Sequence, residues 1–244
     1  PSAISAVTYG TKKIKPVNKV IGPGNQFVSA AKKEVSGDIG IEAMTAGPSE
    51  VLIVADKSSN PEWLASDLLG QAEHDQLAQC ILISKDKNIL EKTKKEVFEQ
   101  LKNLPRSSIA KKSLMMNGIL IYANSDKKII EITNKIGPEH LELNVKNYKS
   151  FVAKIKNAGS VCLGKYAVMA MTDYGAPGSN HVLPTDSSSK YSSGLNVSEF
   201  MKKISYITLS KKGIDKLGPS VITLANYEGL QGHAQSIVKR IRRK

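Results

Sequence analysis

The chain has 244 residues, of which 41% are hydrophobic, so it can bury the core of one large or two modest domains. No apolar run approaches the roughly 20 residues that a membrane-spanning helix needs, and no signal-peptide pattern is present, so we expect a cytoplasmic protein without a membrane partner. The formal net charge of +13 would favour anionic partners, but the lysines are dispersed, aromatic residues make up 5%, and no recognition motif accompanies the basic clusters. We therefore expect no nucleic-acid partner.

The first fifty residues predict a small α/β segment. Residues 1–10 have the pattern of the later part of a helix, residues 19–21 of a short strand, and residues 27–35 of an amphipathic helix. Between the last two lies the turn Gly22-Pro23-Gly24-Asn25, where glycines would let the backbone approach a phosphate. The spacing is not GxGxxG, however, and such a cluster is more often only a turn. Because Pro1 falls inside a helical pattern, we expect the chain to be a piece of a longer protein.

Strands and helices alternate over the middle of the chain. The nearly unbroken apolar run at 49–56 is typical of a strand that is covered on both faces. Further strands are expected at 79–85, 118–124 and 160–164, and helices at 61–75, 88–101, 125–136 and 150–158. This alternation predicts an α/β fold with a parallel sheet flanked by helices, Rossmann-like in its layering.

The remainder of the chain predicts a small helical C-terminal tail. A serine-rich stretch at 187–193 is expected to be a mobile loop or linker, followed by helices at 197–209, 211–217 and 220–243. The expected organisation is therefore the remainder of a first dinucleotide-binding-like α/β domain at 1–50, an α/β domain with most of the chemistry at 51–194, and the tail at 195–244.

The helix at 61–75 ends in the motif GQAEHD. Asn60 and Pro61 supply an N-cap and a proline at the first helical position. If the helix continues to its end, Gln71 and His74 lie three residues apart on one face, which is a plausible half of a metal site. An isolated QxxH is nevertheless more often a polar helix end with a solvated histidine.

All four histidines of the chain stand in short polar motifs. Besides His74, these are His140 in GPEHLEL, His181 in TDYGAPGSNH and His233 in EGLQGH. The GPEHLEL and TDYGAPGSNH motifs are expected on turns after predicted elements, where open α/β sheets usually build sites. That all four histidines stand in such motifs is hard to explain if they are only solvent-exposed surface residues. The two cysteines, Cys80 and Cys162, lie instead in apolar strand-like runs and are expected to be buried reduced thiols.

Taken together, these motifs resemble the C-terminal portion of the histidinol dehydrogenase family. The segments VIGPGNQFV, AGPSEVLIVAD, DLLGQAEHD, IGPEHLEL, DYGAPGSNHVLPT and YEGLQGHA occur in the family's order and extend over nearly the whole chain. The resemblance implies a cytosolic homodimer that oxidises L-histidinol through L-histidinal to L-histidine in histidine biosynthesis. It also implies two NAD used in succession and one zinc per active site. Family members are longer, and the part missing here is N-terminal.

The resemblance assigns the reacting groups to Glu139 and His140. His140 would take the hydroxyl proton as hydride leaves the carbon, and Glu139 would activate the water that attacks the aldehyde. The implied zinc ligands, which also surround the substrate, are Gln71, His74, Asp173 and His233.

Further contacts are implied at the edges of this site. Ser49, His181 and Glu228 would touch the substrate, with His181 near the carboxylate that forms, and Asn25 would contact NAD. In the family the tail reaches the neighbouring subunit, so Glu228 and His233 would complete the partner's site. The chain departs from the family at Ser2, where a glutamine is expected, and mildly in the lead-in at 42–44, which usually contains an aspartate.

Three other interpretations stay open. In a zinc hydrolase, Glu139 and His140 would activate water for amide cleavage. The chain could instead be a non-catalytic zinc-binding fragment that has lost part of its dinucleotide site. A thiol-based aldehyde oxidation would need an activated cysteine, whereas Cys80 and Cys162 are expected to be buried.

Overall fold

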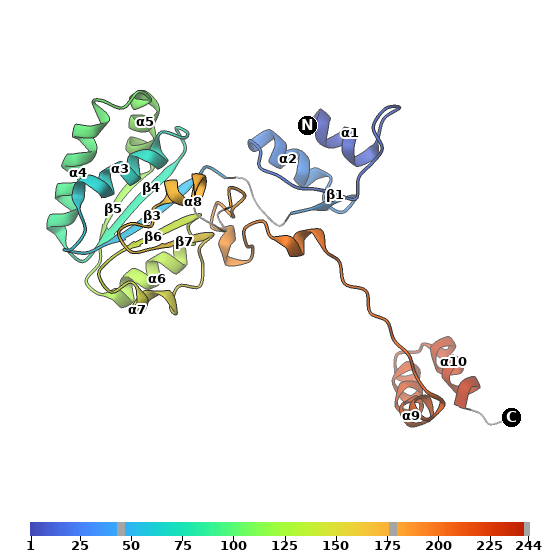
Figure 1. The fold of residues 1–244 in the computed structure, drawn as a ribbon. Coiled ribbons are helices and arrows are strands. Elements are labelled where there is room, and N and C mark those ends of the chain that lie inside the picture. The colour runs from blue at the N-terminus through green and yellow to red at the C-terminus, as the bar shows by residue number, and fades with distance from the viewer. Residues whose placement is uncertain (43–46, 176–179, 242–244) are drawn as a thin grey trace. The chain divides into compact units, whose positions relative to one another are not determined.

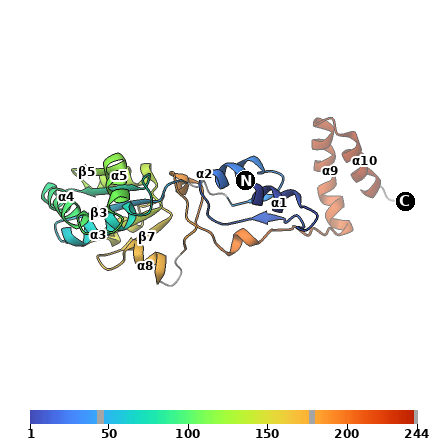
Figure 2. The same ribbon diagram turned by 90° about the horizontal axis from the view of Figure 1, so that it is seen from above.

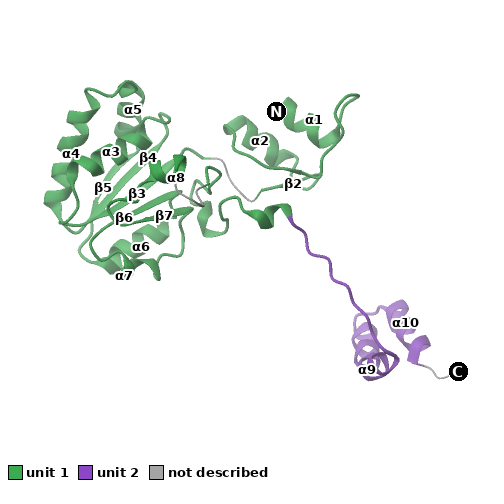
Figure 3. Ribbon diagram, viewed as in Figure 1, with its two compact units in different colours: residues 1–200 green, residues 201–244 purple. Residues whose placement is uncertain are grey.

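The computed structural model describes residues 1–42, 47–175 and 180–241. It consists of two compact units, residues 1–200 and 201–244, which are coloured separately in Figure 3. No helix among the described residues is long and apolar enough to cross a membrane. Parts of the motifs AGPSE and DYGAPGSNH, and of the lead-in at 42–44, lie outside the described residues. The predicted boundaries at 50 and 194 stay a prediction.

Within the described residues, a five-stranded parallel sheet forms the centre of the first unit, in the order β5-β4-β3-β6-β7 (Figure 1). Its strands are β3 Glu50–Ala55, β4 Gln79–Ser84, β5 Gly118–Tyr122, β6 His140–Asn144 and β7 Ser160–Leu163. Each neighbouring pair is parallel. The central strand β3 is buried along its whole length, as its apolar run predicts. The α/β fold with a parallel sheet flanked by helices is therefore confirmed.

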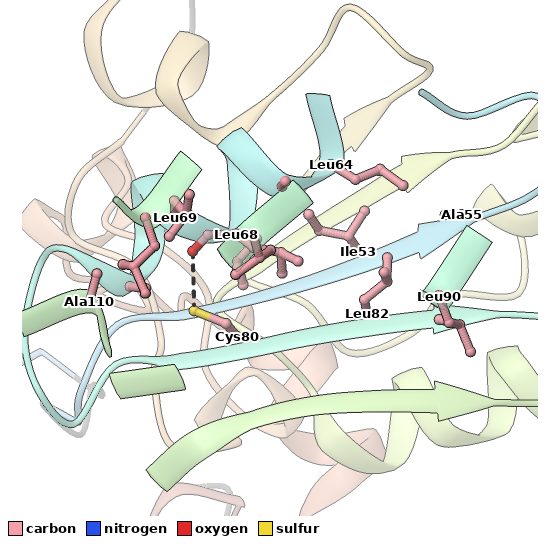
Figure 4. Packing of buried hydrophobic residues seen from close by; sticks show 14 of the residues in the cluster. Ile53, Ala55, Leu64, Leu68, Leu69, Cys80, Leu82, Leu90 and Ala110 are labelled. Carbon is pink, nitrogen blue, oxygen red and sulfur yellow. Dashed lines mark hydrogen bonds between the residues drawn. The ribbon is translucent and has the colours of Figure 1, made fainter. Parts of the chain in front are cut away.

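Helices cover both faces of this sheet. The helices on one face are α3 Pro61–Ala72, α4 Lys87–Leu101 and α5 Ser107–Asn117, and those on the other are α6 Asp126–Ile136 and α7 Lys149–Val152. Ile53 packs with Leu64 and Leu82 on the first face (Figure 4). Leu52 packs with Ile129 on the second. The two core clusters thus follow the two-residue period of the strand.

Side-chain caps begin three of these helices, and the cap of α3 is the predicted Asn60. The side chain of Asn60 accepts a hydrogen bond from the backbone N–H of Glu62 at the start of α3. Asp86 caps α4 and Ser125 caps α6 in the same way. Because a capped backbone donor no longer needs water, each of these residues fixes where its helix starts.

The N-terminal segment is a smaller α/β layer. It contains α1 Ser2–Tyr9, β1 Lys19–Val20, α2 Gln26–Glu34 and β2 Gly40–Ile41, and Figure 2 shows α1 and α2 lying together beside the short strands. The strands β1 and β2 pair in parallel. A small cluster of buried apolar side chains holds the segment together: Ile4, Val35 and Ile39.

Several predicted segments were wrong. The helix expected at 150–158 ends at Val152, and the stretch expected as a helix at 197–209 has only a short 3-10 helix, η2 Val197–Phe200, followed by ten residues without regular structure. Its large apolar residues are exposed, so no buried face stabilises a helix there. In the second unit, α9 Lys211–Tyr227 continues through Pro219, and α10 Gln231–Ile241 follows a turn at Gly229.

The serine-rich stretch is docked onto the first unit rather than free. It contains the 3-10 helix η1 Ser188–Lys190, in which Ser188 and Ser189 are buried. The hydroxyl of Ser189 donates to the carbonyl oxygen of Gly137 at 2.9 Å, and that of Ser187 donates to the carbonyl oxygen of Ile136. The expectation of a mobile linker was wrong because these hydroxyls bond to the end of α6 instead of to water.

Candidate functional site

The motif GPEHLEL lies at the edge of the sheet where the parallel strands begin. Gly137 ends α6 in the left-handed conformation, with φ of 63°. Glu139 follows, and His140 opens β6 directly opposite Val51 of β3. The expectation that the motif is a turn was wrong, since its second half is a fully buried strand. Ligands of open parallel sheets usually bind at the carboxyl ends of the strands, and this group of residues is at the opposite edge.

Glu139 is held by the neighbouring strand. Its Oε2 accepts a hydrogen bond from the backbone N–H of Glu50 at 3.0 Å, and the backbone N–H of Glu139 donates to Oε2 of Glu50 at 3.3 Å. Burial raises the pKa of Glu139 to about 7, and the charges of Glu50 and Asp173 add to that rise. The hydrogen bond from Glu50 opposes it. A carboxyl group with this pKa can both hold and release a proton near neutral pH.

His140 is a buried, predominantly neutral imidazole. Burial lowers its pKa, the nearby His74 and His181 lower it further, and the charge of Asp173 opposes the shift. Its Nε2 lies 3.9 Å from Oε1 of Glu139. Its Nδ1 is buried and has no hydrogen-bond partner among the described residues. The ring can therefore accept a proton and has a nitrogen left for a ligand.

The two residues of the QxxH motif differ in their surroundings. Helix α3 ends at Ala72, so the prediction that Gln71 and His74 share the face of one continuous helix was wrong. The backbone N–H of His74 donates to the carbonyl oxygen of Gln71 at 3.2 Å within the turn that follows. The His74 side chain is exposed, whereas Gln71 is fully buried. Both amide atoms of Gln71 lack a partner among the described residues, which is a costly arrangement that a bound ligand would relieve.

Asp173 comes from α8 Met169–Tyr174, which follows β7 and packs against α3. Its side chain is half-buried, and its charge acts on both Glu139 and His140. The motifs around Gln71, His74, Glu139 and Asp173 therefore meet in one region of the first unit.

The donor set of this region suits a zinc ion. Among the described residues, no group of three or more His, Cys, Asp or Glu side chains is arranged to hold a metal. Three of the predicted zinc ligands lie in the first unit: the imidazole of His74, the carboxylate of Asp173 and the side-chain amide of Gln71. An amide oxygen, an imidazole and a carboxylate fit zinc with a coordination position left open, and the orphaned amide of Gln71 is consistent with that use.

A cavity of about 200 Å³ connects Glu139 with the glycine turn of the N-terminal segment. Its lining includes Ser49, His181 and residues 22–24. The side chain of Lys32 donates to the carbonyl oxygen of Gly22 and to Glu42, so a buried ion pair fixes this turn. Asn25 caps α2 by accepting hydrogen bonds from two backbone N–H groups of its first turn.

Two predicted site residues belong to the second unit. Glu228 follows the last residue of α9, and His233 lies in the first turns of α10; both are exposed. The assignment of Glu228 and His233 to the site stays a prediction.

Both cysteines are free and buried, as predicted. Burial raises the pKa of each thiol to about 12. A thiol that stays protonated at neutral pH is a poor nucleophile, so the thiol-based interpretation finds no support.

Three buried carboxyl groups were missed at the sequence level. Glu50 and Glu142 lie inside apolar strands, and Asp67 lies on the half-buried side of α3. The available signal was a charged residue within an otherwise apolar run, as in SEVLIVAD and HLELN, because a buried carboxyl group needs a specific partner.

Comparisons with known proteins agree with the motifs. The family model described as histidinol dehydrogenase matches residues 1–241. A histidinol dehydrogenase of Pelagibacter ubique is 74% identical over 244 residues, which is 100% of this chain and 57% of that protein. One from Zymomonas mobilis is 44% identical over 98% of this chain and 55% of its own. The crystal structure of histidinol dehydrogenase from Elizabethkingia anophelis superposes with a TM-score of 0.92 at 42% identity, covering 98% of this chain and 55% of that one. The chain thus spans about half the length of the relatives it matches.

Proposed function

The chain belongs to the histidinol dehydrogenase family, and we propose that it takes part in the oxidation of L-histidinol through L-histidinal to L-histidine in histidine biosynthesis. The observation that supports this chemistry best is the buried pair Glu139 and His140 beside a cavity that extends to the glycine turn. Burial raises the pKa of Glu139 to about 7, so this carboxyl group can exchange a proton near neutral pH, and it lowers the pKa of His140, which favours the neutral imidazole that can accept a proton.

His140 is the proposed base for the alcohol. As the carbon loses hydride, His140 accepts the hydroxyl proton, and the alcohol becomes an aldehyde. Its neutral form is the one that can accept this proton, and burial favours that form. Its Nε2 lies 3.9 Å from Oε1 of Glu139, so the ionised form of that carboxyl group favours the imidazolium that forms.

Glu139 is the proposed base for the second half of the reaction. In its ionised form it removes a proton from the water that adds to the aldehyde carbon, and the former carbonyl oxygen takes the proton that His140 holds, which gives the hydrate and returns His140 to its neutral form. The hydrate carbon then loses a second hydride, and one hydroxyl proton passes to His140, which leaves the acid product. Ser49 and His181 line the adjoining cavity, where the substrate and the carboxylate that forms would be held.

Two cofactors belong to this proposal. Bound zinc would orient the imidazole and amine of the substrate, and bound NAD would accept one hydride in each oxidation. Gln71, His74 and Asp173 would hold the metal together with His233, and the orphaned amide of Gln71 supports its assignment. Asn25 and the fixed turn at 22–24 would receive the dinucleotide.

The proposed assembly is a homodimer in the cytoplasm, with the tail exchanged between subunits. Glu228 and His233 would then complete the partner's site. The support is that the second unit leaves several large apolar side chains exposed, including those of Leu217, Val221 and Leu224. Contiguous apolar surface of this kind is typical of an interface.

The experiment that tests the function is formation of NADH from L-histidinol in the presence of zinc. It is made on this chain and on a chain extended upstream to the length of its relatives. NADH from either chain supports the oxidation. Hydrolysis of an amide without NADH would identify a zinc hydrolase instead, and zinc binding without turnover of either kind by both chains would identify a non-catalytic fragment.

A further inference from the structure

Two carboxyl groups that the proposed reaction does not use lie against each other at the base of the site. The carboxyl groups of Asp67 on α3 and Glu142 in β6 lie within reach of each other and interact directly. Glu142 is 1% exposed. Asp67 Oδ2 and Glu142 Oε2 are both buried and receive no hydrogen bond from a donor among the described residues. Two ionised carboxylates can only accept hydrogen bonds, so their contact requires one proton between them.

The surroundings favour a single shared proton. Burial raises the pKa of Glu142 to about 8, and the charge of Asp67 raises it further. Burial also raises the pKa of Asp67, to about 6. Within the described part of the chain, no lysine, arginine or histidine forms an ion pair with either group. The residue opposite Glu142 on β7 is Cys162, whose thiol stays protonated. In such surroundings two neighbouring carboxyl groups cannot both be ionised, so the pair retains one proton.

Each member of the pair also connects to a helix that carries a proposed metal ligand. Glu142 Oε1 accepts a hydrogen bond from the backbone N–H of Met169 at 2.7 Å, at the first residue of α8. Asp173 lies one turn further along that helix. Asp67 lies one turn before Gln71 on α3. The pair therefore bridges the two helices from which Gln71 and Asp173 project.

We propose that Asp67 and Glu142 share one proton and act as positioning residues, fixing α8 against α3 so that Asp173 and Gln71 face one metal ion. This inference rests on the proposed metal site, although the shared proton itself does not require a metal. Groups outside the metal ligands often decide metal affinity because they orient the ligands. Burial and the charge of Asp67 both raise the pKa of Glu142, so the proposal takes Glu142 as the donor of the shared proton and Asp67 as its acceptor.

Two substitutions at one position separate positioning from simple packing. Glu142→Gln keeps an oxygen for the N–H of Met169 and offers an N–H to Asp67, so it imitates the protonated carboxyl group. Glu142→Met has a similar length and provides neither. We expect Glu142→Gln to bind zinc at pH 7 as the unsubstituted chain does, and Glu142→Met to lose about 10–100-fold in zinc affinity. Glu62→Gln, an exposed change on α3, is the matched control and should have no effect.

The pH dependence identifies the proton. As pH rises through about 8, the unsubstituted chain loses the shared proton, and its zinc affinity should fall relative to that of Glu142→Gln, which has no proton to lose. Both proteins have the same zinc ligands, so the protonation of those ligands affects both zinc affinities equally and does not change their ratio. The difference between the infrared spectra of the unsubstituted chain and Glu142→Gln at pH 7 should contain the carbonyl band of one protonated carboxyl group, because the band of Glu139 is common to both and cancels.

Hydrogen exchange supplies a readout that does not depend on metal. The amide of Met169 should exchange faster in Glu142→Met and unchanged in Glu142→Gln, measured without zinc. The inference would be overturned if the amide of Met169 exchanged at the same rate in both variants. It would also be overturned if the zinc affinity of Glu142→Gln fell at alkaline pH as much as that of the unsubstituted chain. If the unsubstituted chain binds no zinc, the proposed metal site fails, while the infrared band and the exchange of Met169 still decide whether the proton-sharing pair holds α8.

Discussion

Glu50 and Glu139 are joined by reciprocal hydrogen bonds, in which the backbone N–H of each residue donates to the side-chain carboxylate of the other, at 3.3 Å for Glu139 and 3.0 Å for Glu50. Glu50 is the first residue of β3 and Glu139 immediately precedes the neighbouring strand β6, so both lie where these two strands begin. This arrangement fixes the Glu139 carboxyl group in a buried position without neutralising it. It explains how a carboxylate at the end of a buried strand can be available for proton transfer.

Replacement of Glu139 by glutamine should separate the two oxidations. Glu139→Gln keeps an oxygen for the N–H of Glu50 but has no base for water, so the first oxidation by way of His140 should continue. The second should slow by about 10²–10⁴-fold, the usual contribution of a general base. The measurement is the NADH formed per histidinol consumed, which should fall from two towards one. A stoichiometry of two at an unchanged rate would exclude Glu139 as the base.

The raised pKa of Glu139 also predicts how stability changes with pH. A carboxyl group whose folded-state pKa is raised binds its proton more tightly when folded, so its contribution to stability falls as pH rises from about 4.5 to about 7. Glu139→Gln removes this dependence. We therefore expect the variant to gain stability over the unsubstituted chain at pH 8, by up to about 3 kcal/mol, and to gain little at pH 4. Urea unfolding at both pH values tests this, and an equal difference at both would contradict the assignment.

Gln71 offers a test of whether its buried amide serves a ligand. Gln71→Leu removes two polar atoms that have no partner among the described residues, so the metal-free protein should be as stable or more stable, by about 1–3 kcal/mol. Zinc affinity should fall by at least about tenfold if the amide is a ligand. Thermal unfolding without metal and a zinc titration are the measurements. A destabilised metal-free protein with normal zinc affinity would show that the amide is structural.

Exchange of the tail predicts complementation between inactive chains. His233→Ala and His140→Ala should each abolish activity, but a mixed dimer would contain one site with both histidines intact. Random mixing of equal amounts would restore about a quarter of the activity of the unsubstituted protein. The control is each variant mixed with itself. No recovery after co-refolding would count against a shared site.

The parts of the fold that follow a single physical rule could be predicted from the sequence. The apolar run at 49–56 has one explanation, burial on both faces, and β3 confirms it. The predicted cap at Asn60 likewise marks a real helix start. The strand β6 was missed because two of its five residues, His140 and Glu142, are ionisable and are buried through specific partners. Such partners come from distant segments, which a local pattern does not contain.

In the candidate site, too, the sequence motifs could be recognised, whereas the contacts between distant segments could not. In the structure the charge of Asp173 acts on both Glu139 and His140, and His74 also acts on His140. Gln71 lies on α3, against which α8 packs. The local geometry was not predictable. Helix α3 ends before His74 because the chain must turn into β4, and Glu50 and Asp67 matter through contacts with residues more than 70 positions away. The roles of these residues in the reaction stay predictions.

The roles proposed for Glu139 and His140 belong to a zinc- and NAD-dependent oxidation of histidinol, which NADH formation measures directly. The chain extended upstream should form two NADH per L-histidinol when zinc is supplied. That activity should be lost on His140→Ala and on removal of the metal by a chelator, and should return when zinc is added back. NADH formation that persists without His140, or that is absent from the extended, zinc-loaded protein, would contradict the account.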